Sequence, residues 1–159
     1  MVMGAVAGGG VAQLPGEART IDVGGFTVVV HAGAGTTSGT FSLIETVEAI
    51  AGSGPPLHIH RDAAESLYVI EGDYLMHLDG HDFRCPTGSF VYVPRGMPHT
   101  FRASTVGSRK LNLYTPSAME GYFDELAEGL GAGVDEAGLD EIAGRYAMDV
   151  LGPAPEGYL

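Results

Sequence analysis

Residues 52–72 read GSGPPLHIHRDAAESLYVIEG, and they carry the most information in the chain. The first half predicts a short strand on which His58 and His60 are two positions apart, so both side chains point to the same face. Glu65 follows a four-residue turn, at the start of the next predicted strand. The glycines and prolines before the histidine pair predict a tight connection into the first strand. The stretch therefore predicts two adjacent strands that bring two imidazoles and a carboxylate close together.

A second stretch, residues 88–103, reads GSFVYVPRGMPHTFRA and places His99 at the start of another predicted strand. Three neutral imidazoles and a carboxylate are a suitable ligand set for a divalent first-row transition metal. In a closed sheet all four groups can converge in the interior. An H-x-H pair is a weak signal by itself, because most such pairs bind no metal. On spacing alone, a metal site and a histidine pair without metal are equally good interpretations.

The segments around these stretches predict an all-β fold. Short runs rich in β-branched and aromatic residues alternate with glycine, proline, aspartate or serine, as is typical of a sandwich or barrel of about nine strands. Asp79 and Gly80 predict a hairpin turn between two of these runs. The predicted strands are 26–32, 40–50, 57–60, 65–71, 74–79, 81–85, 89–94, 99–103 and 110–115.

Helices are expected only after residue 116. Ser117 and Glu120 have the spacing of a capping box, and a helical stripe of apolar residues continues to a stop at Gly131. A second helix is expected near 138–149, and residues 152–159 are expected to form a tail. The predicted organisation is a flexible N-terminal lead-in (1–18), a β-barrel (19–116), and C-terminal helices with a tail (117–159).

Composition limits the possible partners. The chain has 159 residues, and its 20 acidic against 8 basic residues give a net charge of −12. Such a surface repels phosphate, which argues against nucleic acid and anionic membranes as partners. A single cysteine, Cys85, excludes an internal disulfide. No run resembles a membrane span or a signal peptide, so a cytoplasmic location is expected.

With these residues the chain resembles the cupin superfamily, specifically its single-domain members (monocupins). The first cupin motif, G-x5-H-x-H-x4-E-x6-G, is complete, and the second, G-x5-P-x-G-x2-H-x3-N, departs only at Ala103, where the family usually has asparagine. The resemblance implies a double-stranded β-helix, jelly-roll-like barrel that holds one divalent transition metal per chain (nickel, iron, cobalt or manganese). It also implies a homodimer. The implied metal ligands are His58, His60, Glu65 and His99.

The wider pattern is similar to that of the quercetin 2,3-dioxygenase-like cupins. This implies a metal-dependent dioxygenase that cleaves a flavonol or a related enolisable aromatic with O2, with Glu65 as ligand and general base. Glu65 argues against the thiol dioxygenases of the superfamily, which lack this carboxylate. Two alternatives stay open: a non-oxidative metalloenzyme (isomerase, cyclase or decarboxylase) that uses the same site, and a cupin that binds a small molecule without turnover.

Strand alternation predicts which side chains line a substrate pocket. Phe101 and Ala103 share the face of His99, and Met76 shares a face with Tyr74 and Leu78. These five residues are candidates for an apolar pocket that suits an aromatic substrate. The alternative interpretation is that they belong to the plain core of the barrel.

Overall fold

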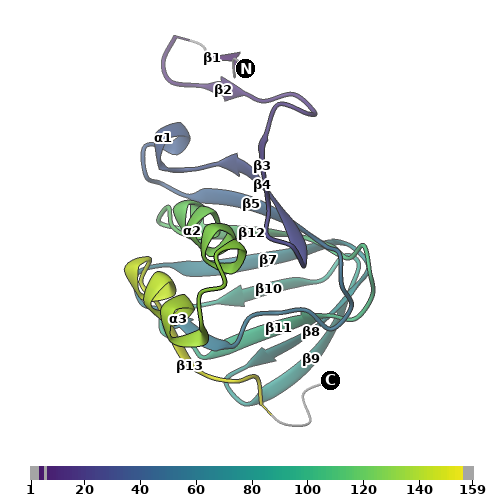
Figure 1. Cartoon of the computed structure of the whole chain (residues 1–159). Coiled ribbons are helices and arrows are strands. Elements are labelled where there is room, and N and C mark those ends of the chain that lie inside the picture. Colours follow the sequence, from purple (N-terminus) through teal and green to yellow (C-terminus); the bar gives the residue numbers. More distant parts are fainter. Residues whose placement is uncertain (1–3, 6, 156–159) are drawn as a thin grey trace.

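Two antiparallel β-sheets form most of the molecule, which is a computed structural model that describes residues 4–5 and 7–155 (Figure 1). In sheet order, the larger sheet contains β10 (Phe90–Val93), β7 (Ala64–Glu71), β12 (Arg109–Thr115), β5 (Ser42–Glu48), β4 (Phe26–Ala32) and β3 (Arg19–Asp22). The smaller sheet contains β13 (Met148–Gly152), β6 (Leu57–His60), β11 (His99–Ala103), β8 (Asp73–Leu78) and β9 (His81–Pro86). A separate pair is formed by β1 (Gly4–Ala5) and β2 (Val11–Ala12). The predicted all-β, double-stranded β-helix is confirmed.

Local sequence explains several of the connections. Asp79 and Gly80 both have positive φ, of 45° and 85°, and they join β8 to β9 in a two-residue hairpin with Leu78 opposite His81. This is the turn that a type I′ hairpin requires. Gly54 has a different role, because a Cβ there would lie 1.8 Å from the backbone oxygen of Phe101. Only glycine lets the loop before β6 approach β11 this closely.

Two apolar clusters fill the space between the sheets. One contains buried residues of β3, β4, β5 and β12 together with residues of the C-terminal segment, among them Phe123, Ala143 and Met148. The other contains residues of β7, β8, β9, β10 and β11. The helices therefore complete one end of the barrel, and the sheets close the other by themselves (Figure 1).

The helices are α1 (Ala34–Thr37), α2 (Glu120–Gly131) and α3 (Glu136–Arg145). The predicted capping box is wrong in detail. Met119, in the left-handed region, precedes α2, and Glu120 accepts a hydrogen bond from the backbone N–H of Ala34 at 2.8 Å. Ser117 lies 3.4 Å from the Glu120 carboxylate without capping the helix. The contact with α1 is long-range, so local spacing could not reveal it.

The C-terminal segment departs from the prediction more strongly. The second helix ends at Arg145, Ala147 has a φ of 58°, and residues 148–152 form β13, which pairs with β6. The sequence predicts residues 148–149 in the helix and residues 152–159 in a tail. A short apolar run reads equally well as a helix end or a strand, and here the edge of β6 determines the outcome. None of the described residues belongs to a helix long and apolar enough to cross a bilayer.

Candidate metal centre

The four predicted ligands come together between the two sheets. His58 and His60 lie on β6, His99 lies beside them on β11, and Glu65 comes from β7 of the larger sheet. One side-chain ligand atom from each residue lies within 4.8 Å of the other three, and all four residues are buried. Alternation places both histidines of β6 inward, and the register pairs His99 with His58. The alternation and the register of the strands thus determine which side chains meet in the cluster.

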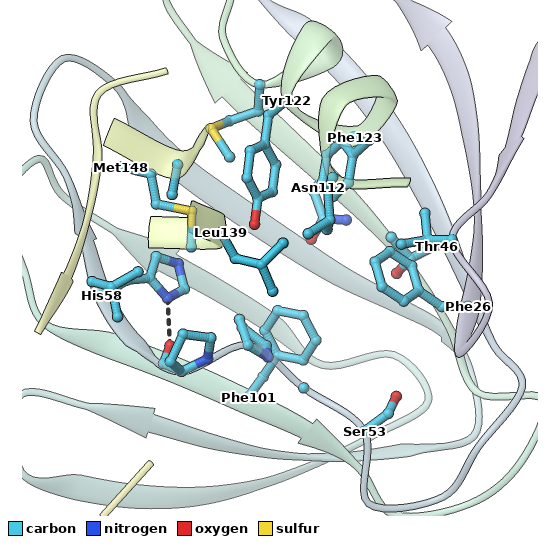
Figure 2. A pocket seen from close by; sticks show the side chains of 18 of the residues that line it. Phe26, Thr46, Ser53, His58, Phe101, Asn112, Tyr122, Phe123, Leu139 and Met148 are labelled. Carbon is cyan, nitrogen blue, oxygen red and sulfur yellow. Dashed lines mark hydrogen bonds between the residues drawn. The ribbon is translucent and has the colours of Figure 1, made fainter. Parts of the chain in front are cut away.

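Backbone carbonyls orient two of the imidazoles. Nδ1–H of His58 donates to the carbonyl of Pro56 at 2.8 Å (Figure 2), and Nδ1–H of His99 donates to the carbonyl of Met97 at 2.9 Å. A ring held in this way presents the lone pair of Nε2 to the centre of the cluster. The two proline-containing turns before β6 and β11 therefore set the tautomers as well as the positions of these ligands.

The electrostatics of the cluster favour a cation. Burial, with the nearby charges of His99 and His60, lowers the pKa of His58 to about 3, so this imidazole is neutral at neutral pH. Burial raises the pKa of Glu65, but the contacts with His60 and His99 outweigh burial and hold this pKa well below its usual value. Neutral imidazoles and an ionised carboxylate are the protonation states in which these groups bind metal ions.

The closest contacts within the cluster test whether a metal ion fits. Oε2 of Glu65 lies 3.1 Å from Nε2 of His60 and 3.0 Å from Nε2 of His99. Because Nδ1–H of His99 donates to the carbonyl of Met97, the neutral form of this ring, which is the form that binds metal ions, has a lone pair on Nε2 that faces the carboxylate. Two lone pairs at this separation repel each other unless a proton or a metal ion lies between them. The residues therefore fit a divalent transition metal, and they leave its identity open.

A cavity of about 460 Å³ adjoins the cluster, and His58, His60 and Glu65 form part of its wall. Its other walls are mostly apolar. Figure 2 shows Tyr122, Phe123 and Leu139 of the two helices facing the cavity, with Phe101 of β11 across from them. The volume lies in the usual range for small-molecule sites.

Of the five predicted pocket residues, the structure places only Phe101 in the wall of this cavity. Tyr74, Met76 and Ala103 are buried in the second apolar cluster, and Leu78 packs against it. Strand alternation predicts that Tyr74, Met76 and Ala103 point into the barrel, as they do. Alternation cannot show which end of the barrel contains the cavity and which end is filled by side chains.

Several residues of the cavity were not predicted. Lys110, Asn112 and Tyr114 alternate along the inner face of β12, and the helices and β13 contribute most of the apolar wall. The signal for β12 was present, because residues 110–115 alternate polar and leucine side chains. Read as an ordinary amphipathic strand, that pattern would place the leucines inside, whereas the structure turns the polar face inward. The ring centroids of Tyr114 and His60 lie 5.4 Å apart.

Known proteins share both the sequence pattern and the fold of this chain. The sequence model of the family described as cupin domain matches residues 45–110, which include all four candidate ligands. The chain therefore contains a cupin domain. An RmlC-like cupin from Shewanella frigidimarina, 20% identical, superposes with a TM-score of 0.60 over 69% of this cupin and 93% of that chain. Ectoine synthase from P. lautus, 17% identical, superposes with a TM-score of 0.54 over 88% of this cupin and 86% of that chain.

Among curated proteins, quercetin 2,3-dioxygenase of Bacillus subtilis is 32% identical to this cupin over 100 residues. The match covers 62% of this cupin but only 28% of the length of the dioxygenase. The sequence analysis predicted a resemblance to single-domain, quercetinase-like cupins. These similarities in sequence and fold confirm it.

Proposed function

We propose that this cupin is a metal-dependent dioxygenase that cleaves a flavonol or a related enolisable aromatic with O2. The observation that carries the proposal is the buried cluster of three histidines and Glu65, of which His58, His60 and Glu65 form part of the wall of a largely apolar cavity. A cavity of this size accepts an aromatic molecule and keeps the cluster away from bulk water. The similarity to the Bacillus subtilis dioxygenase supports the oxidative reaction.

Under this proposal the residues have distinct roles. His58, His60, Glu65 and His99 would hold nickel, iron, cobalt or manganese, which supplies a Lewis acid that polarises an oxygen of the substrate. Glu65 is ionised and accepts the proton of the substrate hydroxyl, as a general base. The apolar walls orient the aromatic rings.

Tyr114 supports the carboxylate of Glu65. Burial, together with the charge of Glu65 and a hydrogen bond with it, raises the pKa of Tyr114 well above its usual value. The phenol therefore keeps its proton and donates a hydrogen bond to the carboxylate of Glu65. Since Tyr114 lies opposite Glu65 in the register of β12 and β7, this contact is built into the sheet.

The proposed reaction can be tested directly. Protein loaded separately with each of the four metals is incubated with quercetin under air, and flavonol absorbance and carbon monoxide are measured. We expect metal-dependent loss of the flavonol with release of carbon monoxide, and no loss in the metal-free protein. Metal-dependent conversion without oxygen would instead identify the non-oxidative alternative. If no metal supports consumption of the flavonol, the proposed reaction is wrong.

We also propose that the cupin forms a homodimer through the edge strand β10. Phe90 and Tyr92 expose 66% and 56% of their surfaces there, and Tyr68 of β7, opposite Phe90, is exposed beside them. An edge strand offers unpaired backbone groups to another chain, and a contiguous exposed apolar patch marks an interaction site. Light scattering after gel filtration should give a dimer mass for the wild type and a monomer mass for Phe90→Ser/Tyr92→Ser. A monomeric wild type would contradict the proposal. The cytoplasmic location stays a prediction.

A further inference from the structure

A buried lysine lies in the cavity wall away from the metal ligands. Lys110 is 1% exposed, and its Nζ donates a hydrogen bond to Oγ1 of Thr46 at 2.7 Å. The ammonium lies 3.9 Å from the ring centroid of Phe101. An ammonium is expensive to bury, and it has three hydrogen-bond donors. Thr46 accepts only one of them.

The charge of Lys110 already has a counter-ion. Oε1 of Glu48 lies 3.8 Å from Nζ, beyond hydrogen-bonding distance but close enough for an ion pair. Glu48 is itself buried, and it accepts hydrogen bonds from Ser53 at 3.1 Å and from Tyr74 at 3.4 Å. Because the pair is already neutral overall, a further negative charge would meet repulsion from Glu48. A neutral oxygen that accepts a hydrogen bond suits Lys110 better.

Asn112, two positions along β12, faces the same cavity and is 2% exposed. Its Oδ1 is buried and has no hydrogen-bond partner among the described residues. A buried polar atom without a partner costs free energy, and such atoms in folded proteins call for an explanation. Figure 2 shows the amide of Asn112 across the cavity from His58. A hydroxyl of a bound molecule would supply the missing donor.

The strand fixes the spacing between these groups and the metal ligands. Tyr114 lies beside Glu65, whereas Asn112 and Lys110 are two and four positions further along the same face of β12. At a strand rise of about 3.3 Å per residue, the Cα atoms of Lys110 and Tyr114 are roughly 13 Å apart. A molecule of linked aromatic rings that binds the metal ion at one end reaches Asn112 and Lys110 with the other.

We propose that Lys110 and Asn112 form a second subsite, which binds a neutral hydroxyl group on the substrate ring remote from the metal ion. The hydroxyl accepts a hydrogen bond from Nζ of Lys110 and donates one to Oδ1 of Asn112. The inference rests on the proposed function and specifies its substrate class: an enolisable aromatic that also carries a phenolic hydroxyl at its far end. An aromatic molecule without this hydroxyl leaves Oδ1 of Asn112 without a hydrogen-bond partner. A molecule with a carboxylate in place of the hydroxyl is repelled by the negative charge of Glu48.

The test measures binding without turnover. Nickel-loaded protein is titrated without oxygen with 3-hydroxyflavone, 3,7-dihydroxyflavone and 3,4′-dihydroxyflavone, and the dissociation constants are read from the absorbance change. We expect at least one dihydroxy compound to bind the wild type roughly tenfold more tightly than 3-hydroxyflavone. In Asn112→Leu this preference should disappear. In Lys110→Met/Glu48→Gln, which removes the ion pair without leaving a lone buried charge, it should disappear as well.

Two further measurements separate binding from a structural role. Asn112→Leu should unfold at the same or a higher temperature than the wild type, because the lost Oδ1 has no partner in the folded protein. Leu139→Ala, in the apolar wall, should weaken binding of all three flavones alike and keep their ratio. A large drop in unfolding temperature for Asn112→Leu would indicate a structural asparagine and overturn the subsite.

The outcomes also distinguish the two proposals. If 3-hydroxyflavone binds only the metal-loaded protein and all three flavones bind equally well, the subsite is wrong and the proposed function stands. If the dihydroxy compounds keep their preference in both variants, the subsite is likewise wrong. If none of the three binds the metal-loaded wild type, both proposals are overturned.

Discussion

Replacing His99 with alanine should reduce the bound metal from about one ion per chain to less than about a tenth of that. His99 is one of four ligands, and its Nε2 lies 3.0 Å from Oε2 of Glu65, where a cation must balance the facing lone pairs. Without the imidazole, two histidines and the carboxylate hold the ion more weakly. The measurement is metal analysis by mass spectrometry after loading and gel filtration.

A matched control uses a histidine outside the cluster. His81 is exposed on β9, so His81→Ala should keep the metal content of the wild type. Thermal unfolding gives a second readout, because a ligand that binds only the folded state raises the unfolding temperature. Added metal should stabilise the wild type and His81→Ala, and it should leave His99→Ala nearly unchanged. A folded His99→Ala protein with wild-type metal content would overturn the ligand assignment.

Replacing Glu65 with glutamine should lower turnover of the flavonol by at least about a hundredfold per bound metal ion. Glutamine has nearly the same shape and keeps an oxygen ligand, so part of the metal remains. Its neutral amide cannot accept the proton that the carboxylate takes from the substrate. Metal content and flavonol consumption are measured on the same sample, so that loss of metal and loss of the base are separated.

Glu71 offers the control for this change. It lies at the other end of the same strand, β7, and is exposed, and its contact with Arg109 is long, at 3.7 Å. Glu71→Gln therefore makes the same chemical change outside the cavity and should leave turnover unaltered. Wild-type turnover per bound metal ion in Glu65→Gln would show that another group accepts the proton.

The ligand cluster could be predicted from the sequence because its geometry is local to two short stretches. Strand alternation places His58 and His60 on one face, and the turns before β6 and β11 contain the prolines and glycines that orient the rings. The barrel followed from the regular spacing of short strands and turns. Spacing alone fits a histidine pair without metal equally well, and the resemblance to the cupins was needed to imply the four metal ligands and the double-stranded β-helix.

The cavity could not be predicted in the same way. Its shape depends on how α2, α3 and β13 pack on the barrel, and these contacts join residues far apart in the chain. Alternation on β12 also indicates the wrong face, because buried Lys110 and Asn112 break the rule that polar side chains point outward. Buried polar side chains that break this rule occur at functional sites, where a bound ligand supplies the hydrogen bonds that the protein itself does not.

The position of β13 has a consequence for the order in which the protein matures during synthesis. β13 is hydrogen-bonded to β6, which carries His58 and His60, and Arg61 forms an ion pair with Asp149, 88 positions later, at 2.6 Å. Until residues 148–152 leave the ribosome, β6 has an open edge with unpaired backbone groups. The smaller sheet around His58 and His60 is therefore completed only at a late step of folding during synthesis.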